Sequence, residues 1–160
     1  MTTERVLDRI DIGILAALQN DGRLSNKELA ASVGLAPSSC LERVRKLRER
    51  GALRGVHADV EPTAMGVGMQ AMISVVMRDQ SQAIQERFVS GMTDTPEVTA
   101  LFNLAGATDY LLHVMVRDTG HLRSFVLEHL ASRQEIRGYT TNLIFVHARS
   151  WELPCYLDGE

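Results

Sequence analysis

Five cations crowd one short stretch of the chain. Between positions 43 and 50, five of the eight residues are basic: Arg43, Arg45, Lys46, Arg48 and Arg50. Guanidinium and ammonium groups donate hydrogen bonds to phosphate oxygens and to the O6 and N7 acceptors of guanine. Two hydroxyl side chains, Ser38 and Ser39, precede them. This stretch therefore offers the chemistry of a polyanion-binding surface, with duplex DNA as the candidate ligand.

A predicted helix that begins at Pro37 and closes at Gly51 positions these groups. A step of 100° per residue divides the helix into two faces. The predicted packing face holds Cys40, Leu41, Val44 and Leu47, and the predicted open face holds Ser38, Ser39, Glu42, Arg43, Lys46 and Arg50. Cations near a helix C-terminus also favour the helix dipole, so a merely solvated basic face remains an alternative.

Two further predicted helices precede this one. Ser25 and Glu28 have the spacing of a capping box, which fixes the start of the nearer helix, and Gly34 supplies the left-handed residue that ends it. An amphipathic helix is predicted to start near Asp8 and to end at Asp21. The three helices make a compact unit in which a tight turn joins the last two, as in a helix-turn-helix.

The segment after Gly51 and the distribution of charge support this interpretation. Residues 52–58 are β-prone and predict a short wing, from which Arg54 and His57 reach phosphate. Residues 1–60 hold ten Lys and Arg against eight Asp and Glu, a net charge of +2, whereas residues 61–160 hold seven against twelve, a net charge of −5. The cationic surface is therefore local, although the whole chain carries −3.

Composition narrows the class of protein. With 160 residues, of which 45% are hydrophobic, the chain suffices for one or two small domains with packed cores. No basic-then-apolar targeting segment opens the sequence, and every apolar run is far shorter than the roughly 18 residues of a membrane span. Cys40 and Cys155 lack the spacing of a metal site or disulfide. We expect a cytoplasmic protein without a membrane partner, metal or cofactor.

The pattern changes after Pro62 from helical to mixed. Strands are predicted at 69–77, 98–105, 109–117 and 136–147, and helices around Phe88 and Phe125. The order β-α-β-β-α-β gives an antiparallel four-stranded sheet with both helices on one face. The expected fold class is α+β, with a winged helix-turn-helix domain at 1–60, a linker at 61–68 and a ferredoxin-like βαββαβ domain at 69–160.

One predicted strand is apolar on both faces and so needs a second surface to cover it. Residues 110–116, YLLHVMV, are apolar on both faces of the strand except at His113. Two helices cover only one side of a sheet, and apolar surface left in water on the other side costs about 25 cal/mol per Å2. We therefore expect a homodimer formed through the sheet, in which a two-fold axis presents two DNA-binding heads.

Taken together, these segments resemble the Lrp/AsnC family of bacterial and archaeal transcriptional regulators. The resemblance lies in LDRIDIGILAALQNDGRLSNKELAASVGLAPSSCLERVRKLRERGALRG, in GATDYLLHVMV, in TTNLIFV and in a terminal LP, and it covers nearly the whole chain. It implies a winged helix-turn-helix that binds double-stranded DNA, and a C-terminal domain that forms dimers and assemblies such as octamers. It also implies a pocket for a small effector, commonly an amino acid. Ala36 departs from the serine usual before Pro37 and removes a side-chain cap worth about 1 kcal/mol, unless Ser38 or Ser39 compensates for it.

The resemblance also suggests which side chains face the DNA groove. The matching positions are Ser38, Ser39, Glu42, Arg43 and Lys46, and we expect Arg50 and Arg54 to bind DNA beside them. Arg43 and Lys46 would donate to guanine or hold phosphate, and Glu42 would accept from cytosine N4. A pair between Glu42 and Lys46 within the helix is the simpler account of that glutamate.

The expected effector site centres on the hairpin at 106–109, GATD. Its backbone N–H groups suit a carboxylate, and Asp109 either balances an α-ammonium group or fixes the loop. Ordinary hairpin chemistry accounts for glycine and aspartate here equally well. The candidate effector-binding residues are Asn103, Gly106, Ala107, Thr108, Asp109 and Thr140.

Two alternative functions stay open. Relatives with the same two-domain plan decarboxylate sirohaem, and binding the tetrapyrrole carboxylates would need clustered Arg and His in the C-terminal domain. The histidines of that part of the chain are instead spread over separate elements: His113, His121, His129 and His147. No nucleophile–base pair or phosphate loop appears, so we do not expect an enzyme. The second alternative, a small-ligand sensor without DNA binding, is disfavoured by the basic helix.

Overall fold

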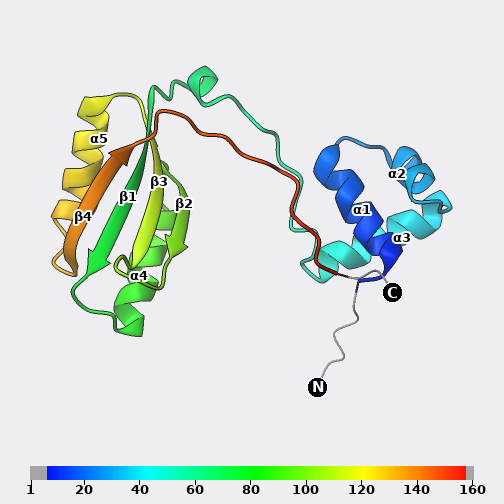
Figure 1. Ribbon diagram of the computed structural model, residues 1–160, viewed down its shortest axis with the longest axis horizontal. Helices are drawn as coiled ribbons and strands as arrows, with labels where there is room; N and C mark the ends of the chain where they lie inside the picture. The colour runs from blue at the N-terminus through cyan, green and yellow to red at the C-terminus, as the bar shows by residue number, and fades with distance from the viewer. Residues whose placement is uncertain (1–6, 158–160) are drawn as a thin grey trace. The chain divides into compact units, whose positions relative to one another are not determined.

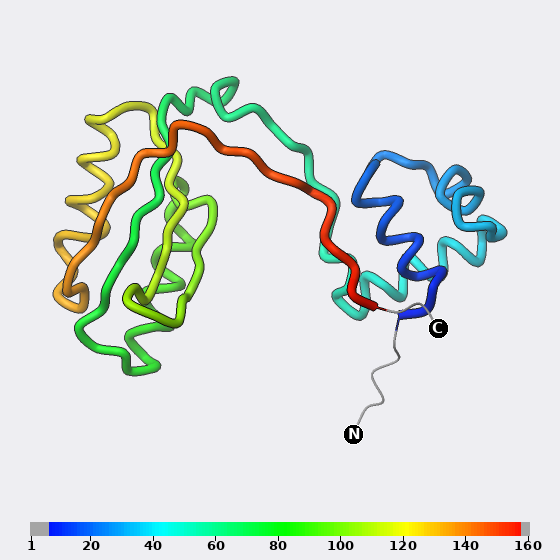
Figure 2. Tube along the Cα trace, viewed as in Figure 1, coloured from blue at the N-terminus to red at the C-terminus, as the bar shows by residue number. Residues whose placement is uncertain are grey.

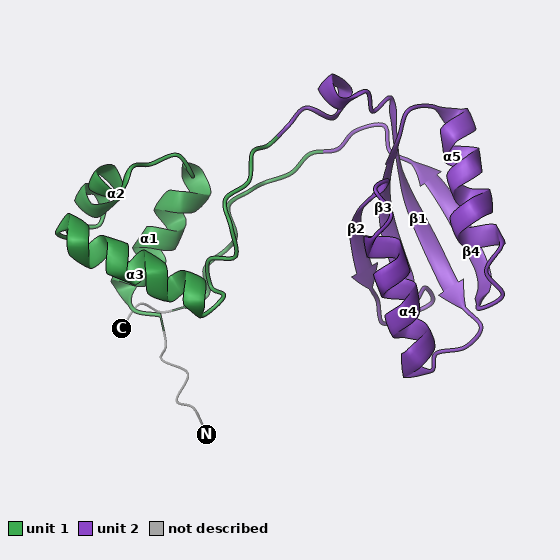
Figure 3. Ribbon diagram, turned by 180° about the vertical axis from the view of Figure 1, so that it is seen from behind, with its two compact units in different colours: residues 1–59, 148–160 green, residues 60–147 purple. Residues whose placement is uncertain are grey.

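Helices form the first part of the chain, and a sheet with two covering helices forms the second (Figure 1). The structure, a computed structural model, describes residues 7–157. The chain divides into unit 1, residues 1–59 and 148–160, and unit 2, residues 60–147 (Figure 3). It thus passes from unit 1 into unit 2 and returns to unit 1 at residue 148 (Figure 2). The sequence-based division differs here, because it places residues 148–160 in the second domain.

Unit 1 contains the three predicted helices, α1 (Arg9–Asn20), α2 (Asn26–Ser32) and α3 (Pro37–Glu49). The predicted capping box is confirmed, because the Ser25 amide donates to Glu28 Oε2 at 2.8 Å and the Glu28 amide donates to Ser25 Oγ at 3.3 Å. Gly34 follows α2 with a φ of +69°, the left-handed conformation expected at a helix end. Helix α3 starts at Pro37, and Ala36 before it provides no side-chain cap, as expected.

The core of unit 1 joins all three helices. Its buried members are Ile14, Leu29, Ala30, Cys40, Val44 and Leu47. Leu41 is 59% exposed, so its predicted place on the packing face of α3 was wrong. One residue step turns the side chain by 100°, which carries Leu41 past the contact with the other helices even though Cys40 is buried.

The predicted wing does not form paired strands. Residues 54–61 have no regular secondary structure, and no backbone–backbone hydrogen bond of the described chain involves residues 54–60. A strand needs a neighbouring backbone to donate to and accept from, which the β-prone composition of this segment cannot supply by itself. Arg54 and His57 are exposed in this segment.

Unit 2 has the predicted β-α-β-β-α-β order, and its sheet is antiparallel with strand order β2-β3-β1-β4 (Figure 1). The strands are β1 (Met69–Met77), β2 (Val98–Asn103), β3 (Tyr110–Val116) and β4 (Ile136–Leu143). The helices are α4 (Gln82–Thr93) and α5 (Thr119–Val126), which a π-helical turn, η2 (Leu127–Ala131), continues. A 3-10 turn, η1 (Pro62–Met65), lies in the predicted linker. The ferredoxin-like prediction is confirmed, although β4 ends before its predicted limit at His147.

Alternation along the strands places one apolar face of the sheet against both helices. The core includes Ile73 and Val75 of β1, Leu112 and Val114 of β3, Phe88 and Met92 of α4, and Leu122 and Phe125 of α5. The opposite side of the sheet, here called the outer face, follows from the strand registers. It carries Gln70, Met72, Ser74, Val76, Ala100, Phe102, Leu111, His113, Met115, Thr140 and Asn142. The sequence predicts that the two helices leave the second side of the sheet open. In the structure this outer face is indeed only partly covered by the chain itself.

His113 is the buried polar residue of the outer face, and both of its ring nitrogens have partners. Nδ1 lies 3.0 Å from Thr99 Oγ1, and Nε2 lies 2.9 Å from Gln70 Oε1. Burial lowers the pKa of His113, and the neighbouring His147 lowers it further. The imidazole is therefore neutral at neutral pH and acts as a satisfied structural group.

No helix within residues 7–157 has the length and apolar character needed to cross a membrane.

Candidate nucleic-acid interface

Helix α3 exposes most of the polar side chains that the sequence analysis predicts to bind DNA. Ser38, Ser39, Glu42, Lys46 and Arg50 are all exposed. On the other side of the helix, Cys40, Val44 and Leu47 are buried in the core of unit 1. These buried contacts fix the rotation of α3 about its own axis and so determine which of its side chains are exposed.

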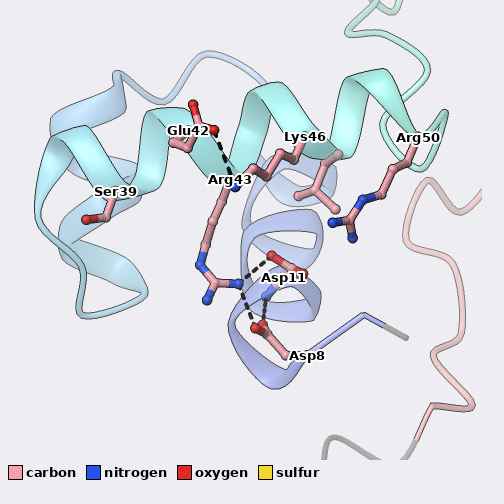
Figure 4. A pocket seen from close by; sticks show the side chains of 8 residues that line it. Asp8, Asp11, Ser39, Glu42, Arg43, Lys46 and Arg50 are labelled. Carbon is pink, nitrogen blue, oxygen red and sulfur yellow. Dashed lines mark hydrogen bonds and ion pairs between the residues drawn. The ribbon is translucent and has the colours of Figure 1, made fainter. Parts of the chain in front are cut away.

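An open groove gathers part of this set beside the first turn of α1 (Figure 4). Its lining consists of Asp8, Asp11, Ser39, Glu42, Arg43, Lys46, Leu47 and Arg50. The structure therefore brings together five of the seven predicted DNA-binding residues. Ser38 is exposed one residue before this lining, and Arg54 lies in the extended segment beyond α3.

Arg43 crosses from α3 to the start of α1. Its Nη1 lies 2.7 Å from Asp8 Oδ2 and 2.8 Å from Asp11 Oδ1 (Figure 4). Asp8 also caps α1, because its Oδ1 accepts from the Asp11 amide at 2.8 Å. That amide and, next, the Arg43 guanidinium lower the pKa of Asp8, while Asp8 and then Asp11 raise the pKa of Arg43. The sequence indicated Asp8 only as a helix start, because a partner 35 residues away leaves no spacing signal.

Glu42 is held by cations of its own helix. Its carboxylate accepts from Arg45 at 2.8 and 3.1 Å and lies 3.3 Å from Lys46 Nζ. Hydrogen bonds from Arg45 first, and from Lys46 second, lower the pKa of Glu42 to about 2. The intrahelical pair with Lys46, the simpler account of this glutamate, is thus present. Among the described residues, Arg48 and Arg50 have no ion-pair partner.

The structure brings only some of the predicted effector-binding residues close to one another. Asp109 Oδ2 accepts from the Met77 amide at 2.6 Å, and its Oδ1 accepts from Gln80 Nε2 at 2.8 Å. Both carboxylate oxygens therefore tie the loop to the end of β1, which is the loop-fixing role that the sequence allowed. Asn103 Nδ2 donates to the Asp109 carbonyl at 3.3 Å. Thr140 lies on β4, whereas Asn103 lies on β2 at the opposite edge of the sheet.

The tip of the same loop is open. Gly106 has a φ of +148°, and no heavy atom lies within 4 Å of the position that a Cβ would occupy there. Ala107 is exposed and Thr108 half-buried. The backbone at the tip is therefore accessible to a ligand, while Asp109 below it is engaged in hydrogen bonds.

Comparison with known proteins extends over both units. Residues 7–48 match the AsnC-type helix-turn-helix domain, and residues 70–148 match the Lrp/AsnC ligand binding domain. The HTH-type transcriptional regulator AldR of Mycolicibacterium smegmatis is 45% identical over 145 residues, 91% of this chain and 85% of that protein. The leucine-responsive regulatory protein of Rhizobium meliloti is 36% identical over 137 residues, 86% of this chain and 88% of that protein. The crystal structure of a transcriptional regulator from Neisseria meningitidis in complex with L-Met is similar with a TM-score of 0.82 at 36% identity, covering 91% of this chain and 94% of that one.

Proposed function

Because this chain belongs to the Lrp/AsnC family of transcriptional regulators, which combines a helix-turn-helix with a ligand-binding domain, we propose that it regulates transcription by binding specific double-stranded DNA through α3. We further propose that an amino acid acts on it as an effector through unit 2. The observation that carries the proposal is the exposed side of α3, where hydroxyls and cations lie opposite a buried apolar side. The major groove of DNA admits such a helix.

The proposed contacts divide by chemistry. Ser38 and Ser39, in the first turn of α3, reach base edges or phosphate with their hydroxyls, and Lys46 and Arg50 hold the backbone. Arg54, exposed beyond the helix, adds a phosphate contact. Glu42 is best placed to orient Arg45 and Lys46, because it already accepts hydrogen bonds from Arg45 and forms an ion pair with Lys46. Register on the DNA thus comes from the cations, and sequence discrimination from the start of the helix.

Removing two of these cations gives the test of DNA binding. In the double variant Lys46→Ala and Arg50→Ala, we expect affinity for the upstream DNA of the protein's own gene to fall by about 10- to 100-fold, since two phosphates are no longer neutralised. The slope of log affinity against log salt should become shallower by about 0.9 for each of these phosphates. Electrophoretic mobility shifts at several salt concentrations measure both quantities.

The matched control removes two exposed cations of unit 2, in the variant Arg87→Ala and Arg123→Ala. This variant carries the same change in net charge, and we expect its affinity to stay within a factor of about two of the parent, because scattered surface charges act weakly through solvent. A wild-type protein that shifts no fragment even at low salt would contradict the proposal. Equal losses of affinity in the two variants would show that the attraction is not centred on α3.

The effector proposal rests on the open loop tip at Gly106 and on one relative. The Neisseria meningitidis regulator forms a complex with L-Met, and we extend from it only the class of ligand, an amino acid. Backbone amides at the tip suit the carboxylate of such a ligand. Since Asp109 is engaged with β1, the α-ammonium partner is a different group of the assembled protein.

A thermal-shift panel of the twenty amino acids tests this proposal. We expect one of them to raise the melting temperature of the protein, by an amount that grows with ligand concentration. Gly106→Trp should abolish the shift by filling the tip. Gly66→Trp is the control, because Gly66 also has a positive φ, +80°, and open space around it but directly follows η1. Retention of the response in Gly106→Trp would overturn the assignment of the loop.

The assembly proposal completes this function. Two chains join through their outer faces into a homodimer, and such dimers assemble further into octamers. A palindromic operator then meets two copies of α3 related by a two-fold axis. The names of the relatives favour regulation over the sirohaem decarboxylase alternative. A tetrapyrrole that copurifies with the protein would instead favour the enzyme.

A further inference from the structure

We infer that Arg43 acts on DNA binding through α1, as a residue that positions α3 and neutralises two carboxylates, and that it does not read a base. This inference rests on the proposed DNA-binding function and reassigns one residue of that site. It differs from the expectation for a basic residue on the open face of a recognition helix, which is a direct contact with guanine or phosphate.

The geometry gives Arg43 two partners that belong to another helix and its cap. Nη1 carries two hydrogens, and its contacts of 2.7 Å to Asp8 and 2.8 Å to Asp11 use both of them. Figure 4 shows the side chain running from α3 across to the first turn of α1. Charge-assisted hydrogen bonds of this length are the stronger kind. Both Nη1 hydrogens of the guanidinium are therefore already engaged with α1 before any DNA arrives.

The two carboxylates differ in what they need from Arg43. Asp8 keeps a second role as the N-terminal cap of α1, through Oδ1. Asp11 is buried, with 8% of its surface exposed, and water solvates it poorly. Without Arg43 this carboxylate would be left without its cation, which is the unfavourable state for a charge away from water. The ion pairs of Arg43 with Asp8 and Asp11 thus stabilise the contact between α1 and α3 and help to set the orientation of α3.

The same cluster controls the charge of the groove. Asp8, Asp11 and Arg43 together carry a net charge of −1, and they line the groove with Lys46 and Arg50. Loss of the guanidinium would change this local charge to −2 on a surface that must approach phosphate. Arg43→Gln should therefore weaken DNA binding even though Arg43 touches no nucleotide. Neutralising the carboxylates as well should then restore the affinity.

A double-mutant cycle on the full chain separates positioning from contact. The variants are Arg43→Gln, the pair Asp8→Asn with Asp11→Asn, and all three together. Asparagine caps a helix about as well as aspartate, so Asp8→Asn removes charge and keeps the cap. We expect affinity for the upstream DNA to fall by roughly tenfold in Arg43→Gln and to return to within roughly threefold of the parent in the triple variant.

A second measurement distinguishes this role from a direct reading of bases. The ratio of affinities for the operator and for unrelated DNA should stay unchanged in Arg43→Gln, because every base contact remains in place. A triple variant as weak as Arg43→Gln, with relaxed discrimination at one base pair, would overturn the inference. Lys46→Gln is the control for a direct contact. We expect it to lower the affinity in the Asp8→Asn, Asp11→Asn background, relative to that background alone, as it does in the parent.

The cycle also stays informative if the proposed function fails. Wild-type protein that binds no DNA would refute that function, while the thermal midpoints of the same variants would still test the coupling. We expect Arg43→Gln and the Asn pair each to lower the midpoint and the triple variant to lower it by less than the sum of the two. Additive midpoints would refute the link between α1 and α3. If Arg43→Gln does not fold, Arg43→Lys, which keeps the cation, should fold and bind DNA like the parent.

Discussion

Leu111→Asp is expected to convert the proposed homodimer into a monomer and to weaken operator binding by about 100-fold or more, since the avidity of two linked heads disappears. Leu111 is half-buried on the outer face, where its cross-strand neighbours are Phe102 on β2 and Ser74 on β1. The Phe102 side chain is 49% exposed within one chain. A carboxylate placed between two such faces would lose its water without gaining a cation, which costs several kcal/mol per subunit. The folded subunit tolerates the change better, because Leu111 points away from its core.

Sedimentation or light scattering measures the mass, and mobility shifts measure the affinity. Leu127→Asp is the matched control, since Leu127 is 53% exposed on η2, in the helical layer that covers the other side of the sheet. We expect that variant to keep the mass and the affinity of the parent. A Leu111→Asp protein that remains a dimer at micromolar concentration would show that the chains associate through a different surface. If both variants remain dimers but bind DNA with unequal affinity, the difference in DNA binding would not come from assembly.

Local chemistry explains why much of this fold is predictable from sequence. The capping box at Ser25 and Glu28, the left-handed Gly34 and the first-turn Pro37 each depend on residues within a few positions of one another. The strands of unit 2 are likewise indicated by alternation and by the turns between them. Their order in the sheet follows from the β-α-β-β-α-β sequence of elements. These features need no knowledge of a distant partner.

Tertiary contacts decide what sequence reasoning missed. The pairing of Arg43 with Asp8 and Asp11 joins residues more than thirty positions apart, and Asp109 reaches Met77 in the same way. Arg43 and Asp109 are ligand-facing candidates in the sequence because their types suit a ligand. In the folded chain the same donors and acceptors find protein partners first. Leu41 and the unformed wing show the complementary limit, since apolar or β-prone character does not provide a surface to pack on or a strand to pair with.

The buried side of α3 forms part of the core of unit 1. Leu47→Ala is expected to lower the free energy of unfolding of unit 1 by about 2–5 kcal/mol, because it removes buried methyl groups and leaves a cavity. Leu47 is 1% exposed and shares its core with Ile14 of α1 and Leu29 of α2. Small helical units have little stability to lose, since total stabilities are of the order of 5–15 kcal/mol. We therefore expect unit 1 to melt well below unit 2 in this variant and DNA binding to disappear with it.

Leu41→Ala provides the control within the same helix. The substitution is chemically identical, but Leu41 is 59% exposed, so we expect a change within about 0.5 kcal/mol. Urea denaturation followed by circular dichroism measures both variants, and mobility shifts at low temperature should give Leu47→Ala nearly the parent affinity while unit 1 stays folded. Equal destabilisation by the two variants would mean that Leu41 is covered in the assembled protein. Helix α3 has one side in the core and one side exposed. A Leu47 variant that loses stability but not low-temperature affinity, beside variants of Lys46 and Arg50 that lose affinity but not stability, would establish that the two sides of this helix act independently.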